Sequence, residues 1–162
     1  MCFWKNLAKF VGMKQSIDFL PERKQRDLHE LVGLIRDEVK DVVMIILYGS
    51  YARNTYVELD IRRDYGGGKI QYMSDYDILV VSKKRLGSRT VTVSSRVKSS
   101  FLKNKNADTQ TRPQIINESI TKFNNALSEG RYFYVDILTE GIVLYDSGEC
   151  QLATPCELNY SE

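Results

Sequence analysis

Two short segments between residues 49 and 77 contain the residue types that could do chemistry. Gly49 and Ser50 follow an apolar run, and Asp75 and Asp77 open another one. A Gly-Ser turn after a strand exposes backbone N–H groups and a hydroxyl that can hold phosphate oxygens. Aspartates two apart on a strand point to the same face, where they can share a hard cation such as Mg²⁺ or Mn²⁺. The pattern indicates a phosphate site beside a metal site.

The aspartate pair also has a plainer interpretation. Aspartates often mark turns, where they cap backbone groups and form salt bridges. Two carboxylates held this close, however, raise each other's proton affinity unless a cation neutralises them. The pair therefore makes most chemical sense with a divalent metal bound.

The surrounding patterns predict the elements that position these residues. Residues 42–48 and 74–81 are short apolar runs that predict buried strands. Residues 22–39 carry apolar side chains at spacings of three and four, which predicts a helix with one buried stripe. The charged residues between them, Lys24 included, are expected on its solvated face. Residues 55–63 and 69–73 alternate around a triple glycine and predict a β-hairpin.

Further along, the chain continues with less regular patterns. Residues 90–103 favour a helix, although their β-branched side chains weaken helix formation. Residues 112–118 predict a third strand, and 119–128 a short helix that ends near a glycine. The apolar stretch 131–145 is expected to be largely buried.

Three groups of side chains have both an ordinary and a functional interpretation. Tyr132, Phe133 and Tyr134 are expected to pack in the core, and a base-stacking platform is the alternative. The basic run 83–85 predicts a solvated loop rather than a nucleic-acid patch. His29, the only histidine, is expected at the surface.

Composition limits the classes of function. At 162 residues and 43% hydrophobic content, the chain suits one domain. Its 23 basic and 21 acidic residues give a net charge of +2, which predicts no extended nucleic-acid surface. Neither a signal peptide nor a membrane span is predicted. Cys2, Cys150 and Cys156 show no metal-ligand spacing, which favours a reducing compartment and a cytoplasmic location.

The combination of motifs resembles the polymerase-beta-type nucleotidyltransferase superfamily. The matching segments are Leu47-Tyr48-Gly49-Ser50-Tyr51-Ala52-Arg53 and Ser74-Asp75-Tyr76-Asp77-Ile78-Leu79-Val80. Within it, the chain looks most like the minimal nucleotidyltransferase (MNT) domains that are paired or fused with HEPN domains. Residues 140–146 resemble the segment that closes such domains. The resemblance implies an α+β fold with a small mixed central sheet, helices packed against it and an inserted β-hairpin.

The resemblance also implies an activity and roles for residues. A nucleoside triphosphate, with ATP first, would be held by Gly49 and Ser50, and Arg53 would either neutralise phosphate charge or form a surface salt bridge. Asp75 and Asp77 would be catalytic and bind the metal ions. AMP would pass to a hydroxyl, on a HEPN-type protein by first choice and on a small molecule by second.

Two departures from the family pattern bear on activity. The hairpin at 55–73 lengthens the usual spacing between the motifs. Active members also carry a third carboxylate on the next core strand, where Glu118 is the only acid, and Asp136 is its rival. The alternative function is therefore a catalytically weak or inactive module that binds and neutralises a helical partner.

These patterns divide the chain into three parts. Residues 1–20 are expected to be an N-terminal extension, whose first twelve residues are either an extension upstream of another start codon at Met13 or a vector-derived piece. Residues 21–148 form the nucleotidyltransferase domain. Residues 149–162 are a tail or the start of a linker to a helical domain, present in a longer chain or in a partner.

Overall fold

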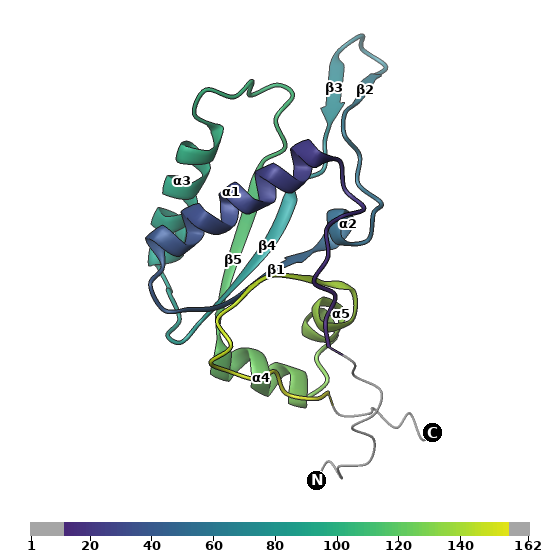
Figure 1. The fold of residues 1–162 in the computed structure, drawn as a ribbon. Helices are drawn as coiled ribbons and strands as arrows, with labels where there is room; N and C mark the ends of the chain where they lie inside the picture. Colours follow the sequence, from purple (N-terminus) through teal and green to yellow (C-terminus); the bar gives the residue numbers. More distant parts are fainter. Residues whose placement is uncertain (1–11, 156–162) are drawn as a thin grey trace, which may run out of the picture.

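A four-stranded mixed sheet forms the centre of the molecule in the computed structural model, which describes residues 12–155 (Figure 1). Its strands lie in the order β5-β4-β1-β6. They are β1 (Val42–Tyr48), β4 (Tyr76–Ser82), β5 (Pro113–Ser119) and β6 (Ile142–Asp146). Strands β4 and β5 are parallel, whereas β1 is antiparallel to β4 and β6. The α+β class and the three predicted core strands are confirmed.

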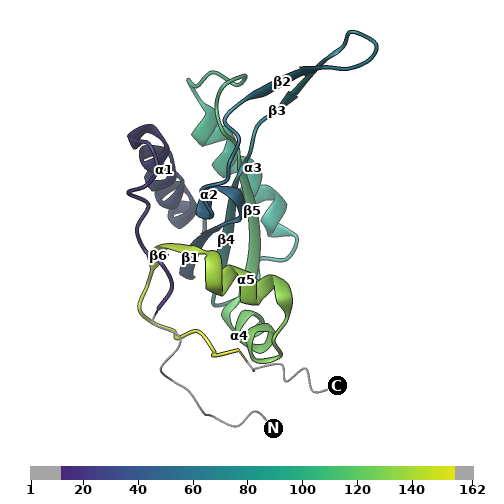
Figure 2. The same cartoon turned by 90° about the vertical axis from the view of Figure 1, so that its right-hand side faces the viewer.

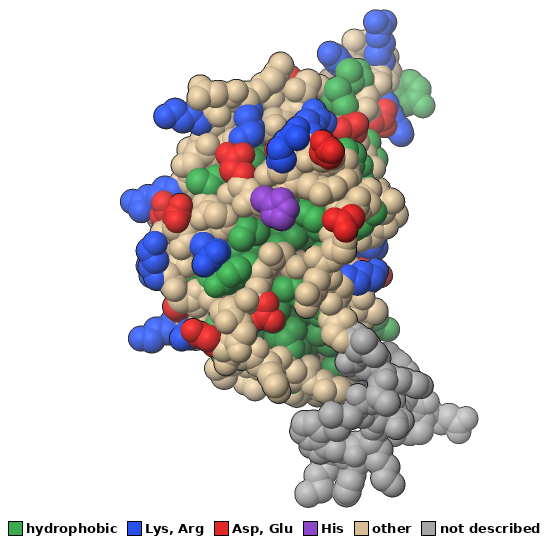
Figure 3. All heavy atoms as spheres, viewed as in Figure 1, with side chains coloured by type: hydrophobic (Ala, Val, Ile, Leu, Met, Phe, Trp, Pro, Cys, Tyr) green, Lys and Arg blue, Asp and Glu red, His purple; other side chains and the backbone are tan. Residues whose placement is uncertain are grey.

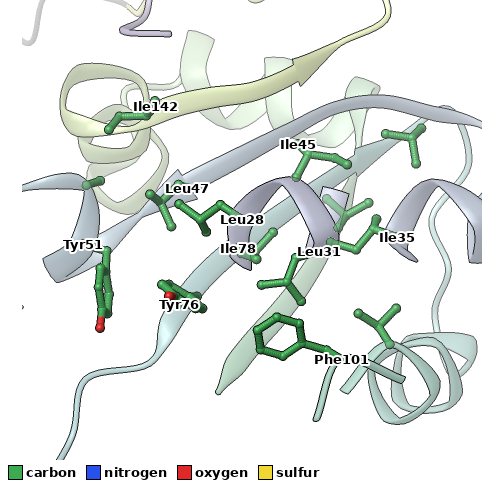
Figure 4. Packing of buried hydrophobic residues seen from close by; sticks show 14 of the residues in the cluster. Leu28, Leu31, Ile35, Ile45, Leu47, Tyr51, Tyr76, Ile78, Phe101 and Ile142 are labelled. Atoms are coloured by element: carbon green, nitrogen blue, oxygen red, sulfur yellow. The ribbon is translucent and has the colours of Figure 1, made fainter. Parts of the chain in front are cut away.

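Helices cover both faces of this sheet. On one face, α1 (Glu22–Glu38) and α3 (Arg89–Leu102) pack through their apolar stripes. Figure 4 shows Leu28, Leu31 and Ile35 of α1 and Phe101 of α3 turned toward the strand residues. On the other face lie α4 (Ile120–Ser128) and α5 (Tyr132–Glu140). The fully buried strands between these layers are apolar on both faces, as their continuous apolar runs predict.

The inserted hairpin is present and projects away from the body of the molecule (Figures 1 and 2). It comprises β2 (Asp60–Arg63) and β3 (Lys69–Tyr72), joined by a turn in which Asp64 accepts hydrogen bonds from two glycine N–H groups. The first strand starts five residues later than predicted. Residues 55–59 are tied back instead, since the Thr55 N–H donates to the Ser50 carbonyl at 2.9 Å.

The prediction that residues 131–145 are largely buried is wrong for the first residues of this segment. Residues 132–140 form a helix, and a helix lying on a sheet buries only one side. Ile137 and Leu138 are on that side, whereas Tyr132 is 72% exposed and Phe133 47% exposed. Core packing of these two aromatic side chains is therefore not observed.

Residues ahead of α1 add to the domain. The Lys14 carbonyl accepts a hydrogen bond from the Val143 N–H, and Ile17 and Leu20 are buried in the core. Cys2 and Cys156, and the prediction about the first residues as far as Val11, lie outside the described residues. His29 is exposed as predicted (Figure 3). No helix in residues 12–155 is both long and apolar enough to cross a membrane.

Candidate active site

The Gly-Ser turn and the aspartate pair meet at one end of the sheet. Strand β1 ends at Tyr48, which lies opposite Asp77 in the β1–β4 ladder, and α2 (Gly49–Ala52) begins at the next residue. Gly49 has a φ of 73°, a region in which side chains are rarely tolerated. A Cβ atom on Gly49 would also overlap the Asp77 carboxylate. Only glycine therefore lets the turn approach the acid this closely.

The aspartate pair is poised to bind a positive charge. Asp75 and Asp77 are both partly buried at the start of β4 and share one face of the strand. Burial raises the pKa of the Asp77 carboxyl, the Asp75 carboxylate raises it further, and the Arg53 guanidinium acts in the opposite direction. The ionised pair is therefore held at an energetic cost that a cation would relieve.

The donor set of the site suits Mg²⁺. Within residues 12–155, no three or more His, Cys, Asp or Glu side chains are placed to hold a metal ion together. Mg²⁺, however, commonly takes one or two protein carboxylates and completes its shell with water and substrate phosphates. Asp75 and Asp77 therefore fit an ion that arrives with a nucleotide.

The structure does not bring Glu118 to the aspartate pair. In the parallel β4–β5 ladder Asp77 lies beside Gln114, while Glu118 lies beside Val81. Four residues along a strand separate Glu118 from that level, about 13 Å at 3.3 Å per residue. The Gln114 amide instead approaches the site, with its Nε2 atom 3.5 Å from Asp75 Oδ2. A glutamine rather than a carboxylate thus lies beside the pair, on the strand where the resemblance implies a third acid.

Glu118 belongs to a separate polar cluster under α4 and α5. It is 8% exposed, and its Oε1 atom accepts a hydrogen bond from the Tyr134 hydroxyl and pairs with Lys122, both at 3.2 Å. Its Oε2 atom is buried and has no hydrogen-bond partner among the described residues. The rival acid, Asp136, is exposed on α5, outside the sheet. Neither acid stands on a strand beside the pair.

Replacing Glu118 should therefore leave the site intact. We expect Glu118→Gln to retain the wild-type affinity for Mg²⁺-ATP, because the side chain lies a dozen ångströms along β5 from Asp77. Isothermal titration calorimetry measures this affinity, and the thermal midpoint monitors the fold. A loss of nucleotide binding at unchanged thermal midpoint would restore Glu118 as a site residue.

Arg53 and Ser50 complete the exposed rim of the site. Arg53 Nη1 lies 3.4 Å from Glu140 Oε2, and both side chains are about half exposed, so the pair contributes little to stability. The predicted surface salt bridge is thus present, yet Arg53 also acts electrostatically on Asp77. The Ser50 hydroxyl has no hydrogen-bond partner within the described part of the chain. Both groups can therefore reorient toward a phosphate.

A buried polar network behind the site is not anticipated by the sequence patterns. Lys24 of α1, predicted on the solvated face, is only 1% exposed. Its Nζ atom donates to Thr111 Oγ1 at 2.6 Å and lies over the rings of Tyr51 and Tyr76. The Tyr76 hydroxyl donates to Asp27 Oδ2 at 2.7 Å. Burial lowers the pKa of Lys24.

This network connects the Gly-Ser turn and the aspartate pair on the α1 side of the sheet. Tyr51 follows Ser50, and Tyr76 separates the two aspartates; both rings are fully buried and 4.6 Å apart between centroids (Figure 4). The spacing of Lys24, Asp27 and Leu28 along α1 matches the buried stripe, and that spacing is the signal that could have revealed them. The interior side of each motif is thus fixed by α1.

Comparison with known proteins gives structural matches only. No protein-family model and no curated protein sequence matches the chain. A chain in the complex of tri-AMPylated Shewanella oneidensis HEPN toxin with MNT antitoxin is 15% identical, with 77% of this chain and 74% of that chain covered and a TM-score of 0.44. A toxin–antitoxin structure with AMP-PNP is 16% identical, with 74% and 73% covered and a TM-score of 0.44.

A third match has the greatest coverage of the three. A protein assigned as a nucleotidyltransferase from Sulfolobus solfataricus is 16% identical, with 84% of this chain and 93% of that chain covered and a TM-score of 0.42. The chain's own geometry gives the more specific information. Its small mixed sheet, with a Gly-Ser turn against an Asp-x-Asp pair, has the architecture that the motifs imply for a polymerase-beta-type nucleotidyltransferase domain.

Proposed function

We propose that this protein is a metal-dependent nucleotidyltransferase that moves a nucleoside monophosphate, AMP from ATP in the first instance, to a hydroxyl group. The observation that carries the proposal is the contact between Gly49 and Asp77. It places a phosphate-accessible turn directly against a carboxylate pair that needs a cation. A purely structural turn would need the glycine for its positive φ, but not the partly buried second acid.

Each residue of the site has a part in this reaction. The Gly49 and Ser50 N–H groups and the Ser50 hydroxyl bind phosphate oxygens, and Arg53 adds positive charge beside them. Asp75 and Asp77 hold the divalent cation, which supplies charge neutralisation when bound. The acceptor oxygen loses its proton to solvent water and forms a bond to the α-phosphorus, the bond between the α-phosphorus and the oxygen that bridges it to the β-phosphorus breaks, and pyrophosphate leaves. Gln114 donates a long hydrogen bond to Asp75 but cannot take the acceptor's proton, because an amide is not a base.

The acceptor we propose is a hydroxyl on a HEPN-type helical protein. Support comes from the two motifs, which resemble those of MNT domains paired or fused with HEPN domains. The toxin of the Shewanella oneidensis complex is tri-AMPylated, so an AMP-modified partner protein is the product to assay for. A small-molecule hydroxyl is the second acceptor.

One observation favours a second function. Gln114 stands in register with Asp77, on the strand where the resemblance implies a third carboxylate. A site without that base would transfer AMP slowly or not at all. The fold would then serve as a module that binds and neutralises a helical partner.

A binding titration followed by a transfer assay tests both functions. ATP is titrated into the protein by calorimetry with and without Mg²⁺, and the protein is then incubated with labelled ATP, Mg²⁺ and a HEPN-type protein. Mg²⁺-dependent binding together with label on the partner supports the enzyme. Complex formation without labelling supports the binding module. Absence of Mg²⁺-dependent ATP binding would overturn the nucleotidyltransferase proposal.

A further inference from the structure

We propose that Phe133, supported by Tyr48, forms the surface on which the nucleobase of the bound nucleotide stacks. The inference rests on the proposed function, since it adds a base subsite to the phosphate and metal site. Phe133 is the second residue of α5, on the sheet face opposite α1 and α3.

Contacts connect Phe133 to the aspartate pair through one residue. Tyr48 lies opposite Asp77 in the β1–β4 ladder, and its ring packs against that of Phe133 with 5.7 Å between centroids and an interplanar angle of 86°. Phe133 therefore stands one aromatic ring away from the carboxylate expected to face the phosphates.

The Phe133 ring is held in place while part of it remains open. Tyr48 contacts it from the strand, and Tyr134 contacts it at 5.4 Å and 82°. Nearly half of the side chain is nevertheless exposed, although Phe is usually buried. A rigid, accessible ring loses little conformational entropy when a base stacks on it. This combination distinguishes Phe133 from an aromatic side chain that only packs.

The chemistry of the subsite defines its selectivity. Stacking is available to every base, so it favours the larger purine rings without distinguishing adenine from guanine. We expect Mg²⁺-ATP and Mg²⁺-GTP to bind with similar affinity, and Mg²⁺-CTP to bind more weakly. Inorganic tripolyphosphate has the phosphates and no base, so its affinity for the protein should not depend on Phe133.

The test compares ATP with tripolyphosphate, each with Mg²⁺, by calorimetry on the full chain. Base stacking contributes about 1–3 kcal/mol, so Phe133→Ala should weaken ATP binding about 5- to 150-fold and leave tripolyphosphate binding unchanged. Phe133→Trp keeps a stacking face and should retain ATP binding. Tyr132→Ala removes the neighbouring exposed ring and serves as the matched control, with wild-type affinity expected.

The outcomes separate this inference from the proposed function. Unchanged ATP affinity in Phe133→Ala would overturn the base subsite while leaving the nucleotidyltransferase intact. Equal losses for ATP and tripolyphosphate would also overturn it, because Phe133 would then act by supporting the phosphate site. If the wild-type protein binds neither ligand in the presence of Mg²⁺, the proposed function fails and the subsite fails with it.

Discussion

Asp77→Asn should abolish nucleotidyl transfer and, at neutral pH without metal, raise the thermal midpoint of the protein. The two effects have one cause. The Asp77 carboxylate is held partly buried beside Asp75, where its charge is unfavourable until a cation binds. Asparagine keeps the shape and removes the charge. The charge that serves binding therefore lowers the stability of the metal-free protein, and the substitution removes this effect.

The pH dependence follows from the direction of the pKa shift. Below the ordinary value of 3.8 the Asp77 carboxyl is protonated in both the folded and the unfolded chain, and contributes no difference. As the pH rises, the unfolded chain loses this proton first, because the folded-state pKa is raised. The free energy of unfolding therefore falls as the pH climbs from about that value through the raised pKa. Asp77→Asn removes this decline, so its stability advantage over the wild type should grow as the pH rises through that window and be complete above it.

Calorimetric thermal scans at several pH values and a transfer assay measure the two effects. The matched control is Asp136→Asn, which removes an exposed carboxylate of α5 that lies outside the sheet. We expect Asp136→Asn to retain transfer activity and to leave the pH dependence unchanged. Transfer that survives in Asp77→Asn would refute the assignment of the aspartate pair, whatever the thermal midpoint does.

The sequence reveals the parts of the fold that depend on local pattern. The apolar runs leading to Gly49 and from Asp75 each specify a buried strand, since few other elements suit seven consecutive apolar or β-branched residues. The glycine at the end of the first strand already indicated a turn with close approach. The helix at 89–102 forms despite its β-branched residues because Val93, Val97 and Phe101 gain burial against the core.

The parts that depend on register and on tertiary contact could not be predicted. Glu118 is the only acid on its strand, but the ladder places Gln114 beside Asp77. The register between two strands cannot be derived from the composition of one of them. The position of Phe133 depends on which side of α5 meets the sheet. The spacing of Lys24 matches the buried stripe of α1, but its polar partners lie far along the chain, Thr111 among them, and these partners could not be predicted.

That buried network supports the second large prediction. Asp27→Ala should destabilise the protein by about 1–3 kcal/mol, the usual cost of leaving a buried hydrogen-bond donor without its partner. The substitution leaves the Tyr76 hydroxyl and the Gln110 amide without their shared acceptor. It also removes a carboxylate field that supports the Lys24 charge, although the carboxylate that pairs with Lys24, at 3.8 Å, is Glu58. Asp37→Ala, on the exposed side of the same helix, is the control and should change stability by less than about 0.5 kcal/mol.

A second substitution shows whether the buried charge is the cause. In the double variant Lys24→Met/Asp27→Ala, an apolar chain of similar length replaces the ammonium. The part of the lost stability that comes from Lys24 losing the Asp27 charge should then return. Urea denaturation measures the free energy of unfolding of each variant. If the double variant is as unstable as the sum of its single variants, Lys24 and Asp27 act independently. In that case the network would not be what positions Tyr51 and Tyr76, or the two motifs that contain these residues.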